Sequence, residues 1–114
     1  MSRVLVLDEI VVKPGLAAEY RRAYSTGYRP GAEKRGMRLE GSWQHPPERD
    51  LEEIPTTLYY LWSLEGVDAW WRMRLSRTPD GADERYAKHA WWQEADRMTV
   101  HRRRTVLSDQ PEEP

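Results

Sequence analysis

Proton transfer is the chemistry for which the sequence supplies the clearest residues. His89 lies in a segment of helical character, and histidine is the side chain best suited to exchanging a proton near neutral pH. If that helix faces a sheet, we expect it to bring His89 to Tyr24, Tyr60 or Trp62, for work on an enolisable or phenolic substrate. The alternative is a surface or interface histidine beside Lys88. The first interpretation makes His89 and Tyr24 candidate catalytic residues.

Two acids interrupt an otherwise apolar stretch near the N-terminus. Asp8 and Glu9 lie within VLVLDEIVV, residues 4–12, so each face of the expected strand carries one carboxylate. A lone buried charge is very costly, but residues 102–104 are consecutive arginines in the expected last strand and could pair with an acid across the sheet. Such a pair is either structural or holds a pocket base, for which Asp8 is our candidate; an arginine could also receive a substrate carboxylate.

Four of the six tryptophans occur in two Ala-Trp-Trp triplets, at residues 69–71 and 90–92. Neighbouring helical residues point about 100° apart, so one indole of each pair can pack on a sheet while the other faces sideways. The indoles either fill a core that has no phenylalanine or line an apolar pocket for an aromatic ligand. A nearby guanidinium, such as that of Arg72, would suit a flat aromatic acid. The candidate substrate-binding side chains are Tyr20, Trp43, Tyr60, Trp62, Trp70, Arg72 and Trp92.

Several other functions are disfavoured. His45, His89 and His101 lack the close spacing of metal ligands, and cysteine is absent, so we predict no metal. His89 or His101 could serve as a haem ligand, but we expect no bound cofactor. No glycine-rich phosphate loop or Gly-x-Ser-x-Gly motif occurs.

The partners are limited by charge and by the N-terminal segment. A net charge of −1 argues against nucleic acid or an anionic membrane as the main partner. The apolar run at the N-terminus is too short and too interrupted for a signal peptide or a membrane span, so we expect a cytoplasmic protein.

The elements that must position these residues follow from hydrophobic periodicity. Alternating or β-branched runs predict strands at residues 4–12, 37–43, 56–64 and 99–107. Helices are expected at residues 16–35, 67–75 and 82–98, and a proline-rich loop at 44–55. Tyr20, Tyr24 and Tyr28 lie four residues apart, which places them on one helix face, while Gly27 and Pro30 weaken or kink the second half of that helix.

This order of elements predicts an α+β fold of the ferredoxin-like, split βαβ type, with a four-stranded antiparallel sheet. Right-handed crossovers place the first strand between the third and the fourth, which agrees with its two apolar faces. Because the helices cover only one face, we expect a second copy of the sheet to cover the other in a homodimer. Residues 1–107 would form this single domain, and residues 108–114 a disordered acidic and proline-containing tail.

The chain resembles the NIPSNAP-type members of the dimeric α+β barrel group. The resemblance lies in Val12 to Gly15 (Val-Lys-Pro-Gly), in the strand from Leu39 to Trp43, and in Leu61-Trp62 followed by a short helix with arginines at 72 and 74. It spans residues 4–107, although the loop at 44–55 is longer than the usual turn of that family. The resemblance implies a dimer with a pocket between each sheet and its own helices. The wider group includes cofactor-free monooxygenases, polyketide cyclases, isomerases, dehydratases, haem enzymes and proteins with no known activity.

These observations together predict a small-molecule enzyme without a bound cofactor, of the cyclase, isomerase or cofactor-free monooxygenase type. The substrate would be hydrophobic, aromatic or polyketide-like, and it would lie between the sheet and the helices. Two alternatives remain open: a non-catalytic protein that binds a hydrophobic ligand in the same pocket, and a purely structural dimer whose aromatic residues are all used in packing.

Overall fold

The structure is a computed structural model that describes residues 3–75 and 90–110. Its strands are β1 (Val4–Val12), β2 (Arg38–His45), β3 (Thr56–Leu64) and β4 (Thr99–Ser108). Its helices are α1 (Ala17–Ala23), the π-helix η1 (Tyr24–Tyr28), α2 (Arg29–Lys34) and α3 (Gly66–Leu75), and residues 90–96 are also helical. The four predicted strands are therefore present, each within a few residues of its expected bounds.

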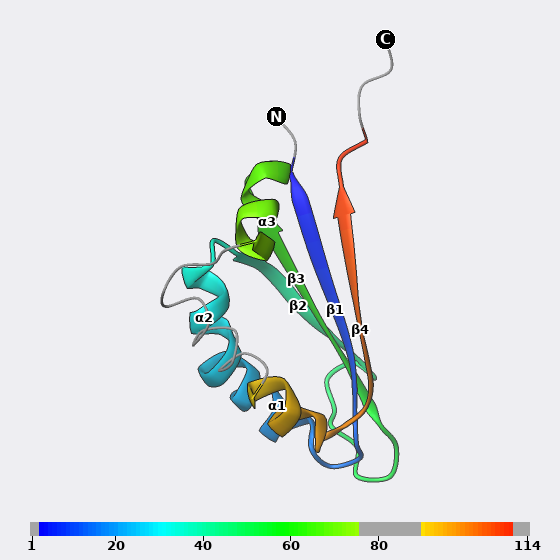
Figure 1. Cartoon of the computed structure of the whole chain (residues 1–114). Coiled ribbons are helices and arrows are strands. Elements are labelled where there is room, and N and C mark those ends of the chain that lie inside the picture. Colours follow the sequence, from blue (N-terminus) through cyan, green and yellow to red (C-terminus); the bar gives the residue numbers. More distant parts are fainter. Residues whose placement is uncertain (1–2, 76–89, 111–114) are drawn as a thin grey trace.

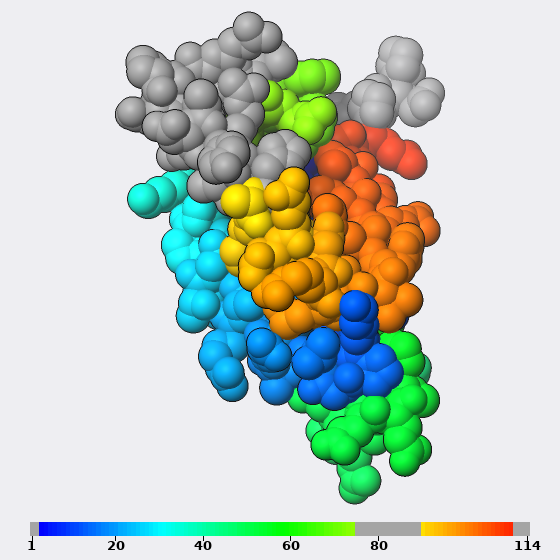
Figure 2. Space-filling view, turned by 60° about the horizontal axis from the view of Figure 1, so that its bottom comes forward, coloured from blue at the N-terminus to red at the C-terminus, as the bar shows by residue number. Residues whose placement is uncertain are grey.

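The strands form one antiparallel sheet in the order β2-β3-β1-β4 (Figure 1). β1 lies at the centre, between β3 and β4, as the right-handed crossovers predicted. The helices lie on one side of this sheet. Figure 2 shows the helical residues 90–96, in yellow and gold, between the blue-to-cyan helices of residues 17–34 and the orange strand β4. The predicted α+β, ferredoxin-like fold is confirmed.

The two faces of β1 differ in burial along its whole length. Burial alternates residue by residue, and the side chains that face the helices are all buried: Val4, Val6, Asp8, Ile10 and Val12. The side chains on the opposite face are only partly buried: Leu5, Leu7, Glu9 and Val11. We call these the covered face and the open face of the sheet. No element among residues 3–75 and 90–110 packs over the open face.

The helix expected at residues 16–35 is instead three successive segments, with a π-helix in the middle. Pro30 lacks the N–H that would continue the α-helical pattern at this point, which gives a physical reason for the change. In an α-helix, residues four apart drift by about 40° per step, and a wider π turn between Tyr24 and Tyr28 offsets that drift. As a result Tyr20, Tyr24 and Tyr28 are all buried on one face. α2 then ends before Gly36, whose φ of 92° is favourable for glycine.

A β-bulge corrects the strict alternation expected for residues 37–43. Leu39 pairs with Trp62, but the next paired residue is Gly41, opposite Leu61, so Glu40 is an extra residue in β2. Because side chains alternate between faces, this insertion moves Gly41 and Trp43 to the open face. Trp43 is 57% exposed there and pairs with Tyr59.

Candidate functional site

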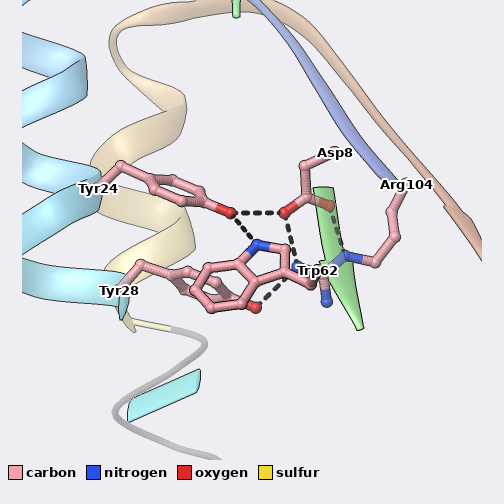
Figure 3. A network of polar contacts seen from close by, with 5 residues as sticks. All are labelled: Asp8, Tyr24, Tyr28, Trp62 and Arg104. Carbon is pink, nitrogen blue, oxygen red and sulfur yellow. Dashed lines mark hydrogen bonds and ion pairs between the residues drawn. The ribbon is translucent and has the colours of Figure 1, made fainter. Parts of the chain in front are cut away.

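The centre of the covered face holds an ion pair between the first and the last strand. Asp8 and Arg104 lie directly opposite each other in the β1–β4 register. Arg104 Nε is 2.6 Å from Asp8 Oδ1, and its Nη2 is 2.9 Å from Oδ2, which makes the contact bidentate (Figure 3). The acid–arginine pair predicted across the sheet is confirmed, and the register identifies Arg104 as the partner of Asp8.

Two tyrosines and a tryptophan extend this pair into a continuous network. Tyr24, from η1, donates its hydroxyl hydrogen to Asp8 Oδ2 over 2.9 Å, and the indole N–H of Trp62, from β3, donates to the Tyr24 oxygen over 2.7 Å. Arg104 Nη2 donates to the Tyr28 hydroxyl, also over 2.7 Å. We call Asp8, Tyr24, Tyr28, Trp62 and Arg104 the Asp8 network; Figure 3 shows their polar groups pointing toward one another.

The surroundings of the network fix its protonation. Burial raises the pKa of Tyr24 far above its usual value, and the negative charge of Asp8 raises it further, although the hydrogen bond from Trp62 opposes both. Burial works against the charged form of Arg104, but its hydrogen bonds and charge contact with Asp8 outweigh this effect and raise its pKa. Near neutral pH, Tyr24 is therefore a neutral donor and Arg104 a permanent cation.

The network is embedded in aromatic rings. Tyr24 stacks on Tyr60 with ring centroids 3.7 Å apart and an interplanar angle of 14°. Trp91 meets Tyr24 edge-on at 5.9 Å, and Trp92 lies 5.1 Å from Tyr28. We call the seven rings the aromatic cluster: Tyr20, Tyr24, Tyr28, Tyr60, Trp62, Trp91 and Trp92.

Two phenols of the cluster lie outside the hydrogen-bonded network. The Tyr20 hydroxyl is fully buried and has no hydrogen-bond partner in the described part of the chain. Burial is the main reason that the pKa of Tyr20 is raised well above its usual value, with the charges of Tyr60 and Asp8 adding to it. Burial also raises the pKa of Tyr60 to about 12. A buried hydroxyl without a partner is energetically unfavourable, so Tyr20 is a natural donor for an oxygen atom of a ligand.

The structure brings together most of the site residues expected from the sequence. Six of them lie in the network or the cluster: Asp8, Tyr20, Tyr24, Tyr60, Trp62 and Trp92. His89 lies outside the described residues.

Three other expected residues lie apart from this group. Trp43 is on the open face, because of the β2 bulge. Trp70 is partly buried on α3, where it packs against Trp71 with centroids 4.7 Å apart. Arg72, also on α3, is exposed.

The structure also adds residues that the sequence did not single out as site residues. Tyr28 receives a hydrogen bond from Arg104, and the four-residue spacing of the tyrosines already pointed to its face. Arg104 was one of three equivalent arginines until the strand register distinguished it. Trp91 packs edge-on or tilted against three tyrosines. Its helical spacing from Ala95 and Met98 is the sequence signal that pointed to this face.

Within residues 3–75 and 90–110, no group of three or more histidine, aspartate or glutamate side chains is placed to hold a metal ion. No described helix has the length and apolar character needed to cross a bilayer.

The sequence matches no protein-family model and no curated protein. Solved structures nevertheless share the fold along nearly the whole chain. A NIPSNAP domain protein from Burkholderia xenovorans has a TM-score of 0.64 at 14% identity, over 97% of this chain and 98% of its own. A NIPSNAP family protein from Agrobacterium tumefaciens has a TM-score of 0.63 at 13% identity, over 92% and 90%.

A second kind of similar structure is described by an activity. A candidate antibiotic biosynthesis monooxygenase from Nitrosomonas europaea has a TM-score of 0.61 at 8% identity, over 94% of this chain and 89% of its own. At such identities the likeness establishes the fold alone. The resemblance seen in the sequence is thus confirmed in three dimensions: the chain has the ferredoxin-like fold of NIPSNAP proteins and of candidate antibiotic biosynthesis monooxygenases.

Proposed function

We propose that this chain is a small-molecule enzyme that needs no bound cofactor and acts on an aromatic or polyketide-like compound held against the aromatic cluster. The observation that carries the proposal is the Asp8 network, a buried chain of polar groups enclosed by aromatic rings. The reaction would be of the cyclase, isomerase or cofactor-free monooxygenase type. The fold shared with candidate antibiotic biosynthesis monooxygenases supports this choice.

The chemistry of the proposal is stabilisation of a developing oxyanion. Tyr24 donates its hydrogen to Asp8, whereas Tyr28 accepts from Arg104 and donates to no acceptor within residues 3–75 and 90–110. Tyr20 likewise has an uncommitted hydroxyl. Hydroxyl donors held in a dry site stabilise an enolate or phenolate far better than water does. Tyr28 is therefore the proposed donor to the substrate oxygen that becomes negatively charged, and Tyr20 the proposed donor to another polar atom of the ligand.

Two further roles, a fixed negative charge and a proton acceptor, are proposed for Asp8 and His89. Protonation of Asp8 would leave Arg104 buried without a counter-charge, so Asp8 is better suited to act as a fixed negative charge that orients Tyr24 and Arg104. The proton-accepting role is then proposed for His89. This division predicts that activity depends on the pH range in which a histidine loses its proton.

We also propose that the protein works as a homodimer. The open face carries partly buried apolar side chains on its central strands: Leu5, Leu7, Val11, Tyr59 and Leu61. A second sheet packed on this face would remove them from water. Light scattering at micromolar concentration should give twice the 13.5 kDa mass of one chain, and a monomer would refute the dimer.

One observation favours a second candidate, a network with a purely structural role. Both oxygens of Asp8 already have hydrogen-bond donors, and Asp8, Tyr24 and Trp62 are almost completely buried. Such a network could serve only to fix the positions of η1, β1, β3 and β4. The two candidates differ in whether any small molecule reaches the cluster.

The first experiment is a fluorescence titration of the protein with aromatic acids, amides, phenols and polyketide-like ketones. Binding at the cluster should quench the emission of the indoles near Tyr24, and a Trp43→Phe variant should keep that quenching, because Trp43 lies on the open face. The absence of any saturable response across the panel would favour the structural role.

Catalysis is then tested with a matched pair of tyrosine variants. Hydrogen–deuterium exchange of an enolisable aryl ketone that binds, followed by NMR, reports proton transfer. Tyr28→Phe should slow exchange by about 100-fold, the usual effect of removing one oxyanion donor. Tyr59→Phe, which alters the open face, should leave the rate unchanged. Equal rates for both variants would remove Tyr28 from the mechanism.

A further inference from the structure

Arg35 follows the last residue of α2 and places its guanidinium beside the aromatic cluster. Its Nη1 is close to the helix backbone, since a Cβ at Gly31 would lie 3.2 Å from it. The guanidinium carbon lies 5.6 Å from the centre of the Tyr28 ring. Arg35 is thereby fixed against the tyrosine whose hydroxyl belongs to the Asp8 network.

The remaining edge of this guanidinium has no partner among the described residues. Arg35 Nε and Nη2 are both buried, and neither makes a hydrogen bond within residues 3–75 and 90–110. These two groups form one side of the planar guanidinium. Arg104 uses the same two atoms, Nε and Nη2, to hold the carboxylate of Asp8. Arg35 therefore presents the geometry of a side-on carboxylate fork.

The charge balance around the cluster points in the same direction. Arg104 is paired with Asp8, and Arg102 is paired with Asp96 at 2.7 Å. Arg35 has no such carboxylate in the described chain, and its contact with the Tyr28 ring compensates only partly for lost hydration. Since arginine does not lose its proton, shielded donors of this kind favour binding of an anion.

We propose that Arg35 binds the carboxylate of the small molecule, which makes aromatic carboxylic acids the ligand class. Tyr28 lies between the two proposed contact regions of such a ligand, because its ring is next to Arg35 and also packs against Tyr24, Trp91 and Trp92. The carboxylate lies at the guanidinium edge and the aromatic ring packs on the cluster. This inference rests on the proposed function and assigns to Arg35 the role expected of Arg72, which is exposed on α3.

The first test needs no ligand. If the Arg35 edge lacks a partner in the free protein, Arg35→Met keeps the packing of the stem and removes an uncompensated charge. We expect the melting temperature to rise by a few degrees. Arg29→Met, on the same helix but exposed and paired with Glu33, should not raise it. An unchanged or lower melting temperature for Arg35→Met would overturn the proposal, since it would mean that the folded chain already satisfies the guanidinium.

The second test compares naphthalene-2-carboxylate with naphthalene-2-carboxamide, a neutral ligand of the same shape, by tryptophan fluorescence. The protein should bind the acid at least about tenfold more tightly than the amide. Arg35→Gln should abolish that preference, Arg35→Lys should keep part of it, and Arg29→Gln should keep all of it. Equal binding of both probes by the unmodified protein would refute the role of Arg35 and leave the proposed function standing. Failure of both probes and of the wider panel would refute the two together.

Discussion

Two ion pairs join the same two strands at neighbouring positions, and they differ in the face of the sheet on which they lie. Asp8–Arg104 is on the covered face, with a contact of 2.6 Å and side chains 3% and 28% exposed. Glu9–Arg103 is on the open face, with a contact of 3.9 Å and side chains 33% and 67% exposed. One residue of displacement along β1 therefore separates a buried, bidentate pair from a loose one in contact with solvent.

The comparison shows that the environment, not the residue types, decides what an acid–arginine pair does. On the covered face, low exposure forces every polar group to find a partner, and the pair becomes the centre of a hydrogen-bonded network. On the open face of a single chain, water screens the charges, so the pair contributes little to the free energy of unfolding.

Removal of the carboxylate should change the free energy of unfolding far more in the Asp8–Arg104 pair than in the Glu9–Arg103 pair. Asp8→Ala should lower the free energy of unfolding by about 3–5 kcal/mol, because Arg104 would remain buried without its counter-charge. Glu9→Ala should cost less than about 1 kcal/mol. Urea denaturation measures both values, and similar losses for the two variants would contradict the contrast.

Alkaline pH should destabilise the fold through the buried tyrosines of the covered face. Tyr20, Tyr24 and Tyr60 have raised pKa values in the folded chain, about 12 for Tyr60, against 10.0 for a free phenol. The unfolded chain therefore loses these protons first. Stability is fully retained below pH 10 and falls as the pH rises toward 12 and beyond. The phenolate absorbance of these buried tyrosines should rise together with the loss of the native tryptophan fluorescence. Ionisation of every tyrosine in a chain that stays folded would contradict the burial of these three.

Two glycines provide the third comparison. A Cβ on Gly27 would lie 2.8 Å from Cδ1 of Trp91, whose indole is held among three tyrosines, so Gly27→Ala should cost about 1–3 kcal/mol. A Cβ on Gly41 would lie 2.7 Å from the far end of the exposed Trp43 ring, which can swing into solvent. Gly41→Ala should therefore cost clearly less in the same denaturation assay. The reverse order would show that Trp43 is held as firmly as Trp91.

The smallest effect concerns the open face alone. Glu9→Gln should change the free energy of unfolding by less than about 0.5 kcal/mol, and added salt should erase even that difference. If the open face is buried in a dimer, the loss should instead grow with protein concentration, since the pair would then lie within the interface. A dilution series of melting temperatures for the variant and the unmodified protein distinguishes these results.

The sequence predicts the framework because its strongest signals are local. Alternating or β-branched runs predicted all four strands, and the two apolar faces of the first strand predicted its central position. The β2 bulge escaped prediction, because one inserted residue leaves no distinctive pattern in the sequence. Gly27 and Pro30 indicated a weakened or kinked helix, but they did not show that the change is a π-helix. The bulge alone decides that Trp43 lies on the open face.

The site is predictable only in part, for a related reason. Tyr20, Tyr24 and Asp8 follow from helical spacing and from the cost of a buried charge, both of which can be evaluated along the chain. The choice of Arg104 among three neighbouring arginines requires the register of two strands that lie far apart in sequence. One edge of Arg35 has no hydrogen-bond partner in the described part of the chain, and no sequence motif indicates this, because it depends on the fold of α2.

The pairing of β1 with β4 limits how early the sheet can fold during protein synthesis. β1 is made first, yet one of its edges stays unpaired until β4 emerges from the ribosome, because Asp8 and Arg104 are separated by 96 residues. During most of translation, the most apolar strand of the chain is therefore exposed to other nascent chains. The sheet closes in a late step that depends on long-range pairing, and such steps are slow. Expression at lower temperature, or together with a chaperone that binds nascent chains at the ribosome, should therefore raise the yield of folded protein. A change of buffer after purification should have a smaller effect.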